Sequence, residues 1–452
     1  MDNKKNYDDG ILYFNLQNSS ILNFDENFNR FLVGTPEVLK KFKKTEINLI
    51  NTYDIFHRRI FKECKFDINT DQIKKIDSFF YDFADQYLRW SFNHKLSLEE
   101  LRKIYHEFAE YWMFFFDNFK IKKIYFDNVP HRAFDYVAYR IAKLTNIETV
   151  IFETTNLNYR VFAKPNLLSD LSNLKKIRSN KKINNMVVST DHVKELKKNN
   201  IINTLKDELL LFIKLILKVI TFQKGDNYLI PYTKNNFFRN LKYLFFIYLS
   251  KLKKFFYTVY YNLSCIKLAK IQINEDDMIF YKHYQPEATS NPSSLPLINQ
   301  NQCLELLLKT KKNIFLKEHP TALTFNNRHM NKSSNKLSNI TFYKKNKIKL
   351  INNKFLNKHI CVTLSGTVGL ECALLGYKVI CFGKPWYYFL PNVHVYYNLK
   401  NLNSFLLDRQ KFNINEIKIE LLNFINDYTE EFNIDNLEIN EKIIIFLKNY
   451  TS

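Results

Sequence analysis

The stretch CVTLSGTVGLECALLGYKVICFGKPWYY, residues 361–388, decides the fold, because it holds four of the chain's seven glycines in a strand–turn–helix–strand pattern. A run rich in β-branched residues at 361–364 predicts a buried strand, and a small-residue turn follows it. The helical pattern over 368–375 ends at Gly376, before a second apolar run at 379–382. This order is typical of one unit of a parallel α/β sheet.

The turn itself consists of Ser365, Gly366 and Thr367. A small-residue turn that opens a helix presents unpaired backbone N–H groups and the positive end of the helix dipole, which suits a phosphate or carboxylate. The simpler alternative is that Ser365 or Thr367 only caps the helix and the glycine only shapes the turn.

Length and composition indicate a folded protein of more than one domain. The chain has 452 residues, enough for two α/β domains with additional helices, and 46% hydrophobic residues exclude disorder as the main state. The net charge of +22 favours anionic partners such as nucleotides or membrane surfaces. Because the lysines are spread along an Asn-, Ile- and Phe-rich chain and form no recognised module, we expect no nucleic-acid partner.

Cysteine use and the N-terminus predict a cytoplasmic protein. The six cysteines include no CxxC pair, which favours a reducing compartment and argues against a zinc site. The N-terminus has no apolar segment of the signal-peptide kind, and the longest apolar run, 208–222, is interrupted by Lys214 and Lys218.

The first part of the chain contains another strand–helix–strand pattern. An amphipathic helix over 97–119, opened by a Ser-Leu-Glu-Glu capping box, leads into a strand at 120–128. A helix over 132–144 and a strand at 147–153 follow. We therefore expect a parallel sheet in the N-terminal half.

The segment 164–270 is Lys-rich and helical in pattern. Within it, residues 237–261 form a basic, aromatic-rich amphipathic helix that could lie in the interface of an anionic membrane, at the inner face of the cytoplasmic membrane. A helix packed on a neighbouring domain, with solvated lysines, explains the same pattern. Both interpretations stay open.

From residue 278 strand candidates alternate with helical segments, as in a doubly wound sheet. The candidates are 278–284, 313–319, 339–344, 348–352, 359–364 and 378–383, and the tail 414–450 is helical in pattern.

Polar residues collect at the ends of three of these strands. They are Gln285, Pro286 and Glu287; Lys317, Glu318, His319 and Pro320; and Ser365, Gly366 and Thr367. Ligands of open parallel sheets bind beyond the carboxyl ends of the strands, so the three groups could converge on one crevice. His319 could hydrogen-bond a phosphate there or protonate it as it leaves.

In this order HYQPEAT, KEHP and SGTVGLECALLGYKVICFG resemble the capsule polysaccharide biosynthesis family, whose relatives include Kdo transferases and, more distantly, bacterial sialyl- and polysialyltransferases. The resemblance covers about 278–388 well and 126–153 less well. It implies a GT-B architecture, an α/β fold of two Rossmann-like domains facing a cleft, with a sugar nucleotide, often CMP-linked, on the C-terminal domain. It also implies that the pair His319 and Pro320 and the turn of Ser365, Gly366 and Thr367 bind the phosphate of the donor. We expect Gln285, Lys317 and Glu371 to belong to the same donor site.

The resemblance also implies that the N-terminal domain holds the acceptor and the catalytic base. Asp127 or His131 could act as the base of an inverting transfer. Asp127, Glu153 or Glu287 could act in a retaining transfer, and His319 as an acid on the donor side. Alternatively, Asp127 caps the next helix and Asp135 is a solvated helical residue.

We expect no metal and no cofactor besides the sugar nucleotide. The sequence has no DxD triplet, and the acidic run 275–277 precedes a strand instead of following one. A basic site with helix N-termini can neutralise the leaving phosphate without a metal.

Together these patterns predict four segments: an N-terminal Rossmann-like acceptor domain (1–163), a basic helical insertion (164–270), a C-terminal nucleotide-sugar domain (271–413) and C-terminal helices (414–452). The predicted function is transfer of a sugar, such as an acidic Kdo- or sialic-like sugar from a CMP donor, to a surface polysaccharide or its lipid-linked acceptor. The alternatives are a CDP-polyol phosphotransferase of the teichoic-acid type and a non-catalytic sugar- or nucleotide-binding assembly protein.

Overall fold

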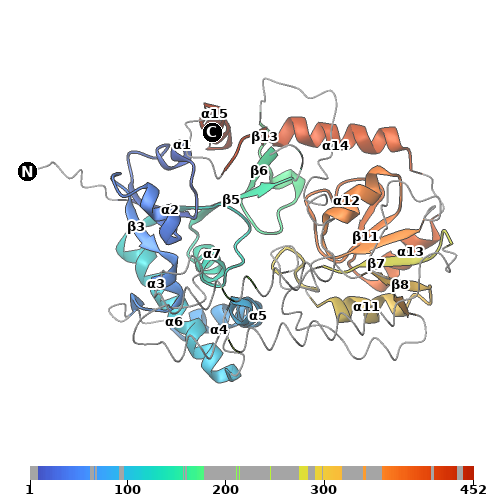
Figure 1. Cartoon of the computed structure of the whole chain (residues 1–452), viewed down its shortest axis with the longest axis horizontal. Helices are drawn as coiled ribbons and strands as arrows, with labels where there is room; N and C mark the ends of the chain where they lie inside the picture. The colour runs from blue at the N-terminus through green and yellow to red at the C-terminus, as the bar shows by residue number, and fades with distance from the viewer. Residues whose placement is uncertain are drawn as a thin grey trace, which may run out of the picture. The chain divides into compact units, whose positions relative to one another are not determined.

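The computed structural model forms two compact α/β units (Figure 1). It describes residues 9–61, 66, 69–90, 96–155, 157, 160–177, 210, 213, 245, 274–283, 291–297, 299–317, 340–342, 359–408, 412–434 and 441–451. The first unit takes in the described residues up to 177 and those from 425 onward, and the second takes in those from 274 to 424.

The first unit is built on a seven-stranded sheet in the order β13-β6-β5-β4-β1-β2-β3. The strands are β1 (Gly10–Phe14), β2 (Asn29–Gly34), β3 (Asn48–Asn51), β4 (Ile121–Phe126), β5 (Glu148–Thr154), β6 (Arg160–Lys164) and β13 (Glu430–Glu431). The first five strands along the chain are parallel and run 3-2-1-4-5 across the sheet, whereas β6 and β13 add antiparallel pairs. This order places a topological switch point between β1 and β4.

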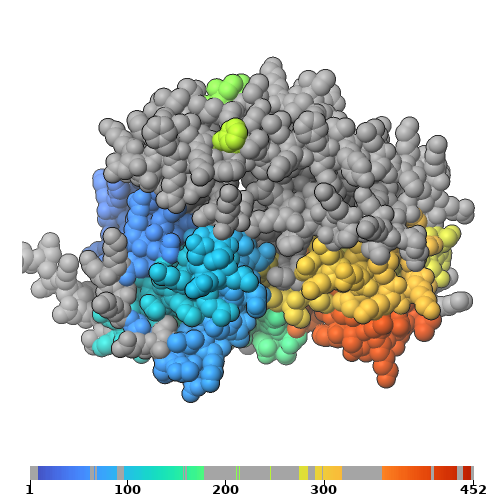
Figure 2. All heavy atoms as spheres, turned by 90° about the horizontal axis from the view of Figure 1, so that it is seen from below, coloured from blue at the N-terminus to red at the C-terminus, as the bar shows by residue number. Residues whose placement is uncertain are grey.

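Helices cover both faces of the first sheet. They are α1 (Ser19–Leu22), α2 (Pro36–Lys41), α3 (Thr52–Phe56), α4 (Thr70–Asp77), α5 (Phe80–Trp90), α6 (Leu98–Asn118), α7 (Phe134–Leu144), the 3-10 turn η2 (Leu171–Asn173) and α15 (Glu441–Thr451). Figure 2 views the molecule from the side on which α4, α5 and α6 are exposed. The predicted capping box of α6 is confirmed by reciprocal hydrogen bonds between Ser97 and Glu100.

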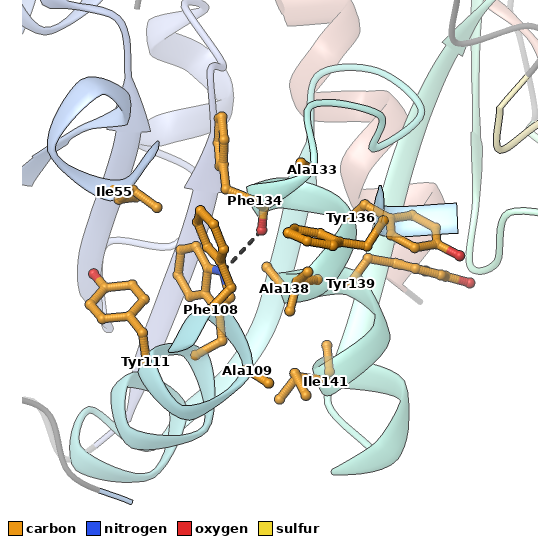
Figure 3. Packing of buried hydrophobic residues seen from close by; sticks show 14 of the residues in the cluster. Ile55, Phe108, Ala109, Tyr111, Ala133, Phe134, Tyr136, Ala138, Tyr139 and Ile141 are labelled. Atoms are coloured by element: carbon orange, nitrogen blue, oxygen red, sulfur yellow. Dashed lines mark hydrogen bonds between the residues drawn. The ribbon is translucent and has the colours of Figure 1, made fainter. Parts of the chain in front are cut away.

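Successive side chains of the central strands point to opposite faces of the sheet and pack in two apolar cores. Leu12, Phe14 and Phe126 pack with α5, α6 and α7. Figure 3 shows part of this cluster, including Phe108 of α6 and Tyr136 of α7. Tyr13 and Tyr125 point to the opposite face, where the second core includes residues of α1, α2 and α15. The two cores explain why the strands are buried on both sides and the sheet is doubly wound.

The second unit has an all-parallel sheet in the order β12-β11-β10-β7-β8-β9. The strands are β7 (Met278–Tyr281), β8 (Ile314–Lys317), β9 (Ile340–Phe342), β10 (Ile360–Thr363), β11 (Val379–Cys381) and β12 (Val393–Val395). In chain order this is 3-2-1-4-5-6, the order of a dinucleotide-binding sheet, with its switch point between β7 and β10.

The helices of the second unit are α11 (Gln300–Leu308), α12 (Thr367–Leu374), α13 (Leu399–Leu407) and the part of α14 (Ile414–Tyr428) up to Phe424. Residues of α11 and α13 share one core with the strands. Helix α12 contacts β10 and β11, and Figure 1 shows it on the side of the sheet opposite α11. Gly376 follows α12 with φ +82°, a left-handed conformation that glycine adopts without strain, so the predicted end of this helix is confirmed.

The predicted fold class, an α/β protein with two Rossmann-like sheets, is confirmed. The helix expected over 132–144 begins two residues later, and β1, β2 and β3 carry no signal that we identified in the sequence. The tail is helical in α14 and α15, but β13 between them joins the first sheet. The predicted strand 348–352 and, apart from the exposed Phe245, the helix 237–261 lie outside the described residues. No helix in the described part of the chain is long and apolar enough to span a bilayer.

Candidate functional site

The ends of β7 and β10 form the switch point of the second sheet. The two strands are paired in register, with Val362 beside Phe280, so the residues that follow them emerge side by side. His283 follows β7, and the turn 364–366 follows β10. Crevices at such a point are where parallel α/β sheets bind their ligands.

His283 holds the turn through its ring. Its Nε2 atom accepts the N–H of Ser365 at 3.2 Å and lies 2.9 Å from the Thr363 hydroxyl, which accepts the N–H of Gly366 at 3.3 Å. A Cβ atom on Gly366 would lie 2.9 Å from Nε2, so the ring can approach this closely only because residue 366 is glycine. The amides of Ser365 and Gly366, which we expected to be available to a ligand, therefore already have acceptors within the protein.

The next two amides are available. Gly366 is the N-cap of α12, with extended backbone and no side-chain cap, and Thr367 is the first helical residue. The alternative that Ser365 or Thr367 caps the helix is thus wrong. Among the described residues, the N–H groups of Thr367 and Val368 have no acceptor, as expected for the first turn of a helix. They can bind an anion.

The turn is also held from its other side. The Tyr387 hydroxyl donates to the Gly366 carbonyl, and the Ser294 hydroxyl donates to that of Ser365 at 3.4 Å. Tyr387 is fully buried, and burial raises the pKa of its hydroxyl strongly, so Tyr387 stays a donor at neutral pH.

Lys317 supplies a cationic group next to β7. It is the last residue of β8, its Nζ lies 5.4 Å from the centre of the Tyr281 ring, and its backbone carbonyl accepts from Lys282. Burial lowers the pKa of its amine, and the charge of Glu371 on α12 counteracts this, so both predicted residues lie near one another.

Several predicted residues cannot be placed, and one important residue was missed. Gln285, Glu287, His319 and Pro320 lie outside the described residues. His283 was not identified as a site residue, although it is the first letter of the HYQPEAT motif. The predicted strand 278–284 included His283, whereas β7 ends at Tyr281, so only the structure shows that this residue follows the strand.

The switch point of the first sheet carries a carboxylate. Asp127 follows β4, and its Oδ2 atom accepts from Asn15 Nδ2, after β1, at 2.9 Å and from Arg132 at 3.3 Å. Its Oδ1 atom accepts no hydrogen bond from the described residues. Asp127 therefore does not cap α7, and it keeps one oxygen for a ligand.

A strained turn aims Arg132 at Asp127. Ala133 has φ +64° and ψ −61°, and Phe134 donates its N–H to the Arg132 carbonyl two residues earlier at 2.8 Å. This is the rare γ-turn with positive φ, which residues with a Cβ seldom adopt. Backbone strain of this kind clusters at functional sites.

Three buried side chains hold this turn. Gln86 of α5 accepts the N–H of Ala133 at 3.2 Å, and Asp135 accepts the N–H of Arg132 at 2.6 Å. Trp112 of α6 donates to the Phe134 carbonyl at 2.9 Å, the dashed line in Figure 3. The expectation that Asp135 is a solvated residue is wrong, because it is 3% exposed.

The other two candidates of the first unit, His131 and Glu153, are each bonded to a neighbouring group. The His131 Nδ1 atom donates to the Val129 carbonyl at 2.6 Å, which restricts the orientation of the ring. Glu153 forms an ion pair with the buried Lys164 of β6. Within the described ranges no three His, Cys, Asp or Glu side chains are grouped as a metal site would need.

Neither a protein-family profile nor a curated protein sequence matches the chain. Solved structures do match. KpsC of Thermosulfurimonas dismutans, a β-Kdo 2,4-transferase, is 11% identical over 66% of this chain and 78% of its own, with a TM-score of 0.29. The KpsC β-Kdo 2,7-transferase of the same organism is 12% identical over 79% and 98%, with a TM-score of 0.30. UDP-GlcNAc 2-epimerase from Methanocaldococcus jannaschii is 11% identical over 92% and 99%, with a TM-score of 0.25. The strand order and pairing of the two sheets establish the fold independently of these likenesses.

Proposed function

We propose that the chain is a glycosyltransferase of surface polysaccharide synthesis, which binds a nucleotide-sugar donor on its second unit and activates the acceptor with its first. The observation that carries this proposal is the repetition of one strand order in both sheets, with polar groups gathered at each switch point. The motif resemblance supports an acidic, CMP-linked sugar as donor, and a polysaccharide or lipid-linked acceptor. The basic, aromatic-rich pattern of 237–261 supports peripheral membrane contact as a further part of the proposal.

On the donor side, the free amides of Thr367 and Val368 would bind the phosphate of the nucleotide. The helix dipole and the amine of Lys317 would stabilise the negative charge that the phosphate gains as it leaves. These groups bind the phosphate more strongly as its charge grows, which is what lowers a transition-state barrier.

On the acceptor side, Asp127 would act as general base. The acceptor hydroxyl oxygen attacks the anomeric carbon, the bond from that carbon to the donor phosphate oxygen breaks, and the hydroxyl proton passes to Oδ1 of Asp127. Arg132 and Asn15, which both contact Oδ2, would keep the carboxylate oriented. Because Glu153 is paired with Lys164, Asp127 is the better candidate of these two carboxylates, and the proposal assigns it the role of base in an inverting transfer.

The donor site is tested with Thr367 variants. Proline is tolerated at the first position of a helix, and the extended backbone of Gly366 suits a residue before proline, so Thr367→Pro removes one amide donor while the fold is kept. Thr367→Val keeps the amide and removes only the hydroxyl. We expect calorimetry with CMP, CDP, UDP and GDP to show binding of one nucleotide, weakened about tenfold by Thr367→Pro and less by Thr367→Val, as one charge-assisted hydrogen bond is lost.

Asp127→Asn serves as the control. We expect this variant to bind the nucleotide with unchanged affinity, because Asp127 lies in the first unit, and to lose transfer of the sugar from the donor that contains this nucleotide. Binding of no nucleotide would refute the enzyme. Glycerol-phosphate transfer from a CDP donor, without sugar transfer, would establish a polyol phosphotransferase instead.

A further inference from the structure

We propose that His283 is a positioning residue of the donor site: its neutral imidazole accepts the N–H of Ser365 and contacts the Thr363 hydroxyl, which accepts the N–H of Gly366, so that the next two amides stay directed at the donor phosphate. The inference rests on the proposed function, since the ligand of this turn is taken to be a nucleotide phosphate. It adds a residue that contacts the turn and not the phosphate.

The hydrogen bonds define the protonation state of the ring. A backbone N–H can only donate, so the 3.2 Å bond from Ser365 requires that Nε2 carries no proton. The Thr363 hydroxyl, 2.9 Å from the same nitrogen, accepts from Gly366 and can donate its own hydrogen to Nε2. The ring is therefore neutral, with its proton on Nδ1.

The backbone of His283 is fixed as firmly as its ring. Its N–H donates to Gln300 Oε1 at 2.7 Å, and Gln300 Nε2 donates back to its carbonyl at 3.3 Å. His283 and Gln300, the first residue of α11, are both buried. The ring thus bridges the ends of β7 and β10 from a rigid base.

The hydrogen bond from the Ser365 amide to His283 determines which amides of the turn remain available to a ligand. Without an acceptor at Nε2, the amide of Ser365 would have to find another partner, at a cost that favours rearrangement of the turn. A rearranged turn would no longer present the amides of Thr367 and Val368 together. Loss of the acceptor, and not loss of ring volume, should therefore weaken nucleotide binding.

The test compares His283→Gln, which keeps an oxygen acceptor at about the reach of Nε2, with His283→Leu, which does not. His359→Gln and His359→Leu are matched controls, because His359 is equally buried and bonded to Tyr281 but precedes β10 instead of following β7. With the nucleotide of the CMP, CDP, UDP and GDP panel that binds the unmodified chain, we expect a tenfold or larger rise in Kd for His283→Leu, less than threefold for His283→Gln and no change for the His359 pair.

A second measurement does not depend on ligand. Long-range ¹H–¹⁵N correlation of the histidine-labelled protein should show His283, assigned by its absence in His283→Gln, as the neutral Nδ1–H tautomer. A charged ring or an Nε2–H tautomer would overturn the inference, as would equal losses of affinity for the two His283 variants or unchanged affinity for His283→Leu. If no nucleotide binds at all, the proposed function fails, and the tautomer alone decides the role of His283.

Discussion

Asp135 is a buried carboxyl group whose protonation should show in the pH dependence of stability. Burial raises its pKa to about 6, although the Arg132 charge and N–H counteract the rise. Since the folded chain binds this proton more tightly than the unfolded chain, the contribution of Asp135 to stability is present below pH 4 and is lost as the pH rises through 6. The loss is at most about 3 kcal/mol.

The comparison with Asp135→Asn isolates this effect. Asparagine keeps an oxygen that can accept from Arg132 but cannot ionise. We expect the stability of Asp135→Asn relative to the unmodified chain to increase between pH 4.5 and pH 7 in urea unfolding experiments. A difference that does not vary with pH would show that Asp135 titrates normally.

The residues of the turn after β10 were predictable, whereas the side chains that hold the groups at the two switch points were not. Ser365, Gly366 and Thr367 stand out because small residues between a strand and a helix mark a turn. His283 and Asn15 act through partners 82 and 112 positions away, and the sequence around them does not indicate those partners. Long-range pairs of this kind depend on strand order.

At the scale of elements, the γ-turn before α7 is unusual, because Ala133 adopts a positive φ that residues with a Cβ seldom adopt. Ala133→Gly should stabilise the first unit by about 1 kcal/mol, because relief of about 1–3 kcal/mol of strain exceeds the entropy that glycine loses on folding. Chemical unfolding measures the gain. Ala138→Gly in the middle of α7 is the control, and it should destabilise by about 1 kcal/mol.

Gln86 should be coupled to this turn. Gln86→Leu removes the acceptor of the Ala133 N–H inside the core, which costs about 1–3 kcal/mol. In the Ala133→Gly background the turn can relax, so the cost should be smaller. A double-mutant cycle measures the difference, and strictly additive effects would mean that Gln86 does not hold the turn in its strained form.

Helices and strands were predictable where the hydrophobic pattern was long or where capping residues marked its ends. The capping box of α6 and the glycine after α12 identified these helices from the sequence. Strands β1, β2 and β3 were not identified because only brief helices separate them, so that neither the strand period nor the helix period dominates the pattern. Ala133 could not have been predicted, since alanine gives no sign of positive φ.

At the scale of the whole molecule, the sequence predicted two parallel sheets but not how the chain returns to the first. Arg160 of β6 donates to the side chain and carbonyl of Thr429, and β13 then pairs with β6. Such pairing joins residues 269 positions apart, and no local pattern in the tail distinguishes a strand of two residues. The C-terminal helix α15 therefore completes the core of the unit in which the chain begins.

This return predicts which unit a mutation in the tail destabilises. Phe446 of α15 is fully buried and contacts Phe152 of β5 and Phe432, so Phe446→Ala should destabilise the first unit by about 3–5 kcal/mol. Leu402→Ala, in the core of the second unit, is the matched truncation. Hydrogen–deuterium exchange should accelerate in peptides of β1, β5 and β6 for Phe446→Ala, and in peptides of β7 and β10 for Leu402→Ala. Faster exchange in β10 for Phe446→Ala would place α15 in a core that both sheets share, because a cavity accelerates exchange in the cooperative unit that contains it.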